Sequence, residues 1–144
     1  MNKFVLTITA LLVAAGLTLS ACASTNAPAG LNGTSWKLVS YGPTGNQMPA
    51  APGIDTSLIF GTDGQASGNM GCNSFGGNYD VKGGNLAFSQ MISTMMACPE
   101  PQMTQEGTAF QVMNGTVPFE IQGNTLKIHD ASGATTLILS RTGN

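Results

Sequence analysis

The sequence predicts a mainly β domain: about eight antiparallel strands forming a small open or cracked barrel, with one α-helix at about residues 99–114 packed against it. Stretches of alternating apolar and polar residues recur at intervals of about 8–12 residues, separated by turn residues. Nineteen glycines beside only 8% charged residues are typical of a turn-rich chain. The 42% apolar residues are enough to build a core, and 144 residues suit one domain.

In the first half, the alternation predicts strands at residues 34–41, 56–61, 65–70 and 77–82. Trp36 is the only tryptophan and shares a strand face with Leu38, so we expect it to anchor the core. Residues 42–53 are rich in proline, glycine and asparagine and predict a connecting loop.

In the second half, a strand opens at Leu86 and is expected to continue through residues 91–97. The helix follows, because Pro101 suits a first helical turn and Asn114-Gly115 is a stop signal. Met103, Phe110 and Met113 are predicted to fall on one side of this helix, with Glu106 nearby. Three final strands are predicted at residues 117–122, 125–130 and 134–141.

The N-terminus resembles a bacterial lipoprotein leader. Residues 1–21 combine Lys3 with a short uncharged apolar run, as a signal peptide does. Leu19-Ser20-Ala21-Cys22 is similar to a lipobox, which implies cleavage before Cys22 and its lipidation. Ala23 is not the aspartate that retains lipoproteins in the inner membrane. We therefore expect an outer-membrane anchor, a tether at residues 22–30, and a periplasmic domain at residues 31–144.

The stretch from Gly68 to Tyr79 is the most distinctive part of the domain. Its four glycines predict a strand, a tight Gly-Cys-Asn corner and a second strand. The corner is either a binding surface or a structural brace, and the brace is the simpler interpretation because turn residues need no ligand to explain them. The residues that we assign to this candidate corner are Gly71, Asn73, Phe75, Tyr79 and Glu106.

A family resemblance rests on several short motifs together. They are Leu31-x-Gly33-Thr34-x-Trp36-x-Leu38, Ser67-Gly68-x-x-Gly71-Cys72-Asn73-x-Phe75-x-Gly77-x-Tyr79, Thr94-x-Met96-Ala97-Cys98, Glu106, Phe110 and Leu126. With these motifs, residues 31–144 resemble the META/HslJ family of small envelope lipoproteins. The resemblance implies a β-rich fold with one helix, and links to stress response and antibiotic tolerance. The family's likeness to pilot lipoproteins of secretion systems implies an apolar groove between helix and sheet, for an acyl chain or a peptide.

Cysteine usage predicts one disulfide. Lipidation of Cys22 leaves Cys72 and Cys98, and an even pair in an oxidising compartment is typical of a disulfide, worth about 3–4 kcal/mol. One alternative is a Cu(I) site built from these two thiolates and nearby methionines, Met70, Met95 and Met96. Another is a free thiol nucleophile, for which His129 is the only histidine available.

The remaining motifs weigh against catalysis. The sequence contains no Gly-x-Ser-x-Gly, P-loop, zinc spacing or dinucleotide fingerprint, and no second carboxylate or histidine lies at a useful spacing from Glu106. Glu106 is therefore expected to bond the corner or solvent. The net charge of −2 gives no footprint for nucleic acid.

We expect a monomeric, non-catalytic accessory or binding protein without a metal or cofactor, anchored through Cys22. Its partner would be an envelope protein or an apolar ligand. The alternative is an inhibitor of a periplasmic hydrolase such as lysozyme, which would insert the loop at residues 42–53 or the Gly-Cys-Asn corner into a cleft.

Overall fold

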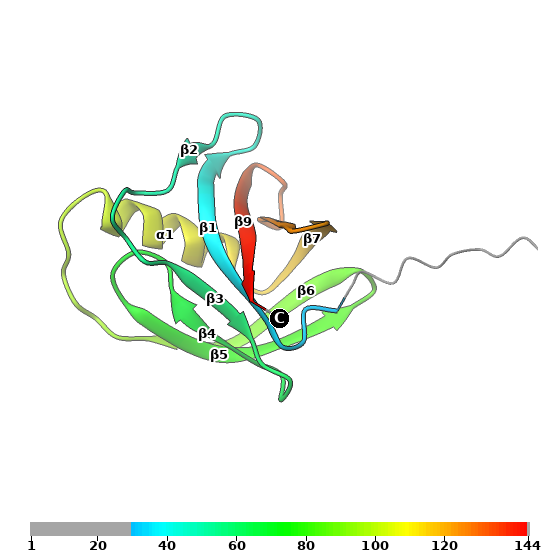
Figure 1. The fold of residues 1–144 in the computed structure, drawn as a ribbon. Helices are drawn as coiled ribbons and strands as arrows, with labels where there is room; N and C mark the ends of the chain where they lie inside the picture. The colour runs from blue at the N-terminus through cyan, green and yellow to red at the C-terminus, as the bar shows by residue number, and fades with distance from the viewer. Residues whose placement is uncertain (1–29, 144) are drawn as a thin grey trace, which may run out of the picture.

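Nine strands and one helix make up the fold in the computed structural model, which describes residues 30–143 (Figure 1). The predicted signal peptide, Cys22 and the tether lie outside the described residues. The strands are β1 (Thr34–Pro43), β2 (Met48–Pro49), β3 (Ser57–Phe60), β4 (Gln65–Asn69), β5 (Ser74–Lys82), β6 (Asn85–Ser93), β7 (Thr116–Gln122), β8 (Thr125–His129) and β9 (Thr135–Gly143). The helix is α1 (Gln102–Val112), inserted between β6 and β7.

Eight of the strands close into an antiparallel barrel, because the first strand pairs with the last. The order around the sheet is β1-β3-β4-β5-β6-β7-β8-β9, and β9 returns to β1. Two register shifts in β1, at Ser35/Trp36 and Leu38/Ser40, mark bulges that bend the strand and let so small a barrel close. The mainly β prediction is confirmed, and the barrel is closed.

Pairing between β6 and β7 is short for strands of their length. Only Asn85, Leu86 and Ala87 of β6 pair with β7, although β6 continues to Ser93. The next contact on that side is the Phe88 N–H, which donates to the Gly115 carbonyl at 2.8 Å. Beyond it, β6 has no strand partner on this side within residues 30–143.

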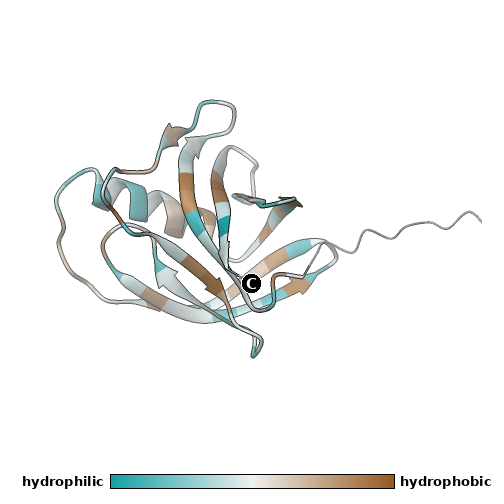
Figure 2. Cartoon of the chain, viewed as in Figure 1, coloured by the Kyte–Doolittle hydropathy of each residue, from teal (hydrophilic) through white to brown (hydrophobic). Residues whose placement is uncertain are grey.

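The core fills the barrel with large apolar side chains from alternate strand positions (Figure 2). Trp36 is fully buried, its indole N–H donates to Thr34 Oγ1 at 2.8 Å, and the Arg141 guanidinium lies 4.5 Å from its ring centre. Each such buried side chain stabilises the fold by about 1.5–3 kcal/mol. Trp36 is the core anchor that the sequence predicted. Across residues 30–143, no helix has the length and apolar character that crossing a membrane requires.

Two predicted boundaries are wrong around the helix. The strand expected at residues 91–97 ends at Ser93, because the next residues bond to the Gly-Cys-Asn corner. The helix begins at Gln102, because two prolines precede it and proline disfavours helical backbone in the residue before it. Residues 42–53 contain the short strand β2, which pairs with Ser40 and Tyr41 of β1.

The predicted apolar side of the helix is confirmed only in part: Met113, just after α1, is buried, as is Glu106. The buried residues of α1 are Gln105, Glu106, Ala109 and Val112. Met103 is 38% exposed, and Phe110 is half-buried at the rim. The pattern of apolar residues did not predict this buried face, because two of its four residues, Gln105 and Glu106, are polar and form hydrogen bonds with loop backbone.

The close approach of β3 to β4 requires glycine at position 68. Gly68 has φ +154°, and a Cβ there would lie 1.9 Å from the Ser57 carbonyl oxygen. We expect Gly68→Ala to lower the free energy of unfolding by about 2–4 kcal/mol, because the strands must separate. Gly107→Ala is the matched control: a Cβ there meets nothing within 4 Å, and alanine in a helix stabilises by about 1 kcal/mol. Urea denaturation measures both, and equal effects would contradict this account.

Candidate functional site

The Gly-Cys-Asn corner is held by one buried carboxylate. Glu106 Oε2 accepts the Cys72 N–H at 2.9 Å and also the Asn73 N–H, while Oε1 accepts Asn73 Nδ2 at 2.6 Å. Asn73 and Glu106 are only 4% and 5% exposed. A carboxylate placed against three N–H groups in a buried turn replaces the water that the turn has lost. Glu106 therefore bonds the corner, which is one of the two roles that the sequence analysis expected.

The Asn73 side chain extends this network to the segment after β6. Its Oδ1 accepts the Met96 N–H at 2.7 Å and the Thr94 hydroxyl at 2.9 Å, and its Nδ2 also contacts the Met96 carbonyl at 3.3 Å. The Thr94 N–H still donates to Ser74 of β5, but the Met96 backbone bonds to the Asn73 side chain instead of a neighbouring strand. This explains why strand pairing stops at Ser93.

The helix approaches the corner closely enough to require Gly71. A Cβ on Gly71 would lie 2.6 Å from the Gln102 carbonyl oxygen and 3.3 Å from Glu106 Cβ. Before the turn, Asn69 Oδ1 accepts the Gly71 N–H at 2.8 Å, which forms an Asx turn. Gln105, fully buried, donates to the Met70 carbonyl at 2.6 Å and accepts the Ala51 N–H at 2.7 Å.

A disulfide joins Cys72 in the corner to Cys98, with the two Cα atoms 6.0 Å apart. This is the pair that the cysteine count predicted. The disulfide removes both thiolates from the alternative Cu(I) site, and Met70 is buried in the core whereas Met95 lies at the surface. Among residues 30–143, no group of three or more His, Cys, Asp or Glu is placed to hold a metal ion.

The five residues assigned to the corner separate into two groups. Gly71, Asn73 and Glu106 meet in the buried network, but Phe75 and Tyr79 point into the barrel. Tyr79 packs edge-on against the Phe60 ring, and its hydroxyl donates to the Gly61 carbonyl at 2.7 Å. Burial, and secondarily the nearby Asp63, raises the pKa of Tyr79.

The corner therefore has the geometry of a brace. Its polar groups bond to one another and lie beneath α1, so the corner has no free edge to insert into an enzyme cleft. If the protein inhibits a hydrolase by inserting a segment into its cleft, the remaining candidate segment is the loop at residues 42–53, whose tip projects beside β2 (Figure 1).

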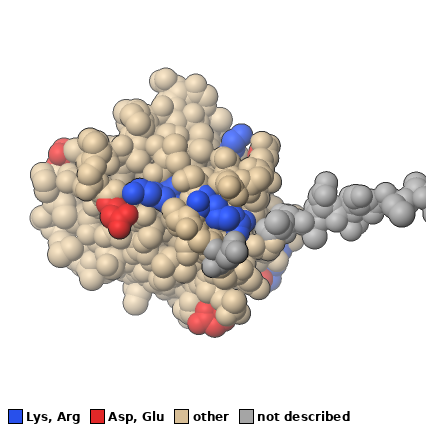
Figure 3. Space-filling view, viewed as in Figure 1, with Lys and Arg blue, Asp and Glu red and all other residues tan. Residues whose placement is uncertain are grey.

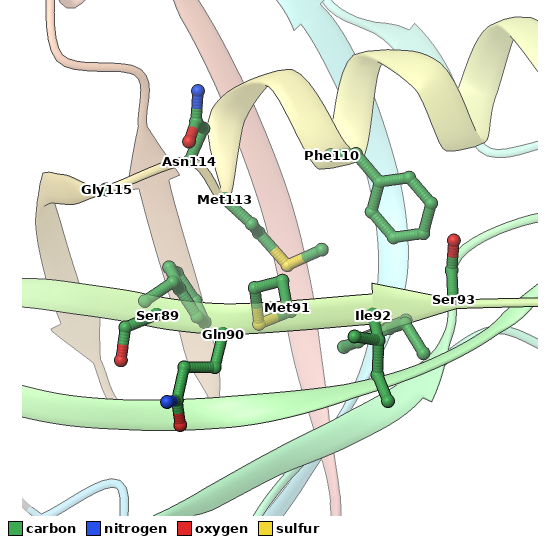
Figure 4. Close-up of a pocket in the computed structure, with 11 residues that line it drawn as sticks. Ser89, Gln90, Met91, Ile92, Ser93, Phe110, Met113, Asn114 and Gly115 are labelled. Atoms are coloured by element: carbon green, nitrogen blue, oxygen red, sulfur yellow. The ribbon is translucent and has the colours of Figure 1, made fainter.

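A groove lies where β6 leaves β7, between β6 and the C-terminal end of α1, and its lining combines aromatic and methionine side chains with uncharged polar ones. It has a volume of about 460 Å³. In Figure 4, Met91 and Met113 point toward one another from the strand and the helix, and Phe110 extends from α1 toward Ser93. Phe75 packs edge-on against Phe110 with ring centres 5.7 Å apart. The full lining is Phe75, Phe88, Ser89, Gln90, Met91, Ile92, Ser93, Phe110, Met113, Asn114 and Gly115.

A second hollow continues the groove toward the start of α1. It shares Ser93 and Phe110 with the groove and is otherwise lined by Asn73, Thr94, Met95, Met96, Ala97, Met103, Glu106 and Gly107. Three side chains around it are strongly exposed: Ile92 at 75%, Met95 at 97% and Met96 at 57%. The groove itself has no charged lining residue. On the face in Figure 3 charged side chains are few, and basic ones lie across its middle beside an acidic one.

Two parts of this arrangement were not predicted from individual residues. The buried role of Gln105 was missed, and its position beside Glu106 in a weakly amphipathic helix was the available signal. The lining residue Met91 was also missed, because it was placed within a continuous strand. The groove itself was implied by the family resemblance, but its residues depend on the point at which β6 and β7 separate.

Comparison with known proteins agrees with this architecture. A family model described as META domain matches residues 29–143. An NMR structure of a protein from Burkholderia xenovorans is similar to the chain, with a TM-score of 0.66, 24% identity, and coverage of 79% of this chain and 85% of that one. No curated protein matches the chain.

A further solved structure shares the fold at lower identity. It is the crystal structure of a DUF4847 family protein from Bacteroides vulgatus, with a TM-score of 0.56 and 12% identity. It covers 78% of this chain and 94% of that chain. At such identities these structures show a shared fold only.

The Glu106 network predicts a graded response to substitution. Glu106→Ala leaves the Cys72 and Asn73 N–H groups buried without an acceptor, which should lower the free energy of unfolding by about 3–5 kcal/mol. Glu106→Gln keeps one acceptor oxygen but places an NH2 group against a donor, so we expect a smaller loss of about 1–3 kcal/mol. Denaturant unfolding with the disulfide intact measures both. Glu100→Gln, at an exposed position, is the control, and an Ala variant as stable as the native chain would refute the brace.

Proposed function

Because the chain belongs to the META domain family, and because its barrel leaves an uncharged groove with aromatic and methionine side chains open beside α1, we propose that it is a lipid-anchored binding protein of the bacterial envelope. It is non-catalytic, and the groove holds an apolar partner. The domain faces the periplasm from the outer membrane. Its biological setting is the response to envelope stress, including antibiotic tolerance.

The groove is the observation that carries the proposal. The rest of the core is filled by fully buried side chains, so the lining aromatic and methionine side chains mark the place where an apolar ligand gains most from leaving water. Methionine side chains such as Met91 and Met113 are flexible and polarisable, which suits ligands of varied shape.

The absence of catalysis is supported by how the polar groups are used. The one strongly buried carboxylate, that of Glu106, is occupied by three N–H donors of the corner. His129 lies on the outside of the barrel, where Nδ1 contacts Thr136 Oγ1 at 2.8 Å and Nε2 is 3.7 Å from Glu120. Neither side chain lines the groove, so the groove offers a ligand shape and apolar contact.

The groove is tested with N-phenyl-1-naphthylamine, an uncharged apolar probe that fluoresces when it leaves water. We expect binding to the native chain, and at least a roughly ten-fold weaker Kd for Met91→Lys, because ligand binding would then dehydrate a charge. The control is Ile59→Lys, which places the same charge on an exposed position of β3. Circular dichroism checks that both variants fold. No probe binding, or equal binding by the two variants, would refute the groove as the binding site.

The anchor is tested by Cys22→Ala in the full chain. We expect the native chain to incorporate labelled palmitate and to stay with the outer-membrane fraction, because buried acyl methylenes each contribute about 0.8 kcal/mol. The variant should lose the label. Ser24→Ala, two residues further on, should behave like the native chain. Unchanged labelling of the Cys22→Ala variant would disprove lipidation at this position.

A further inference from the structure

We propose that the partner held by the groove is an uncharged, apolar peptide segment in extended conformation, which adds as a strand to the free edge of β6 at residues 89–93. The inference rests on the proposed function and specifies its ligand. Three features support it: the hydrogen-bonding edge, the shape of the apolar strip, and the absence of charge.

The edge of β6 presents backbone groups to the groove. The Thr94 N–H donates to the Ser74 carbonyl at 3.0 Å, so this residue faces β5. In an antiparallel ladder the direction of these groups alternates, and Ser93, opposite Phe75, therefore directs its N–H and carbonyl away from β5. At the other end of the edge, the Phe88 N–H is directed the same way and is already bonded to Gly115. The stretch between them is open to a new strand.

The edge has a feature that limits pairing to a short segment. Gln90 has φ +53°, and the β5–β6 register shifts between Gly76 and Asn78, so β6 carries a bulge. Met91 lies over Gly77, where a Cβ would come within 2.4 Å of its sulfur. Bulges twist an edge strand and prevent unrestricted sheet-to-sheet association. A short peptide can follow this bend along residues 89–93, whereas a long flat sheet edge cannot.

The apolar strip is elongated along this edge. The groove and the neighbouring hollow share Ser93 and Phe110, and the exposed Ile92, Met95 and Met96 lie on the segment that joins them. A strand matching residues 89–93 needs about 17 Å, and its side chains would alternate between the groove and the solvent. Extended peptides recognise sheet edges in this way, through backbone bonds for affinity and pockets for alternate side chains.

The chemistry of the strip favours a neutral peptide over a charged peptide or a hydrocarbon. No charged residue lines the groove, and Glu106 in the neighbouring hollow is already bonded to the corner, so a charged side chain of the partner would lose its water without gaining a counter-ion. An acyl chain would cover the Ser93 peptide groups without bonding to them. A peptide strand offers the complementary N–H and carbonyl groups.

The test uses two capped peptides of alternating valine and threonine, one plain and one N-methylated at the residues whose N–H groups would face β6. The protein is the exported chain in the form that the cell produces, inserted into phospholipid nanodiscs if it is acylated. We expect the plain peptide to bind with a Kd at least roughly ten-fold lower than the N-methylated one. Exchange of the Ser93 amide hydrogen should slow on binding of the plain peptide only.

Variants of Ser93 test the same edge from the protein side. Ser93→Pro removes the edge N–H and should weaken plain-peptide binding by at least roughly ten-fold, whereas Ser93→Ala keeps the backbone and should bind like the native chain. Because proline can disturb β6, binding of the N-methylated peptide and the thermal midpoint are measured for both variants.

Several outcomes overturn the inference, and they differ from failure of the proposed function. If both peptides bind equally, or if N-phenyl-1-naphthylamine binds and neither peptide does, the groove binds its ligand without using the edge of β6. A lipid retained in native mass spectra and not displaced by the plain peptide identifies a hydrocarbon ligand instead. A dimer that Ser93→Pro dissociates assigns the edge to a second copy. If neither peptide nor naphthylamine binds, the proposed function itself fails.

Discussion

The structure depends on a single buried carboxylate that accepts the backbone of a tight turn. Glu106 arrives from α1, and its acceptors Oε1 and Oε2 hold Cys72 and Asn73 from the turn between β4 and β5. A turn packed under a helix loses its water, and only an acceptor supplied by that helix can replace it. This contact fixes where α1 sits on the barrel, and the Cys72–Cys98 disulfide ties the chain before the helix to the same point.

The position of α1 in turn creates the groove. Hydrogen bonds to the Asn73 side chain hold Thr94 and Met96 beside the turn, so the chain leaves the sheet after Ser93 and crosses to the helix. The strand after the helix, β7, rejoins β6 only at Asn85–Ala87. The remaining part of β6 faces the C-terminal end of α1 across apolar side chains. A brace at one end of the helix thus leaves a groove open at the other.

Much of the fold followed from alternation and turn residues. The strands on either side of Gly123-Asn124 and the burial of Trp36 were predicted, because each depends on local pattern and on side-chain size. The predicted element boundaries were wrong where hydrogen bonds to residues distant in sequence outweighed the local secondary-structure propensity. Residues 94–96 have strand-forming character, but the Met96 backbone bonds to the Asn73 side chain. The buried face of α1 carries Gln105 and Glu106 because loop backbone needs polar partners there.

The sequence by itself determined the class of the domain, the pairing of its two domain cysteines and the residues of the tight corner, since composition, count and glycine spacing are properties of the chain alone. Only the tertiary structure decided that the barrel closes between β1 and β9, that Phe75 and Tyr79 leave the corner for the core, and that β6 keeps a free edge beside Met91. The physical reason is that closure, burial and edge exposure depend on which distant segments compete for the same backbone groups, and no local pattern records the result of that competition.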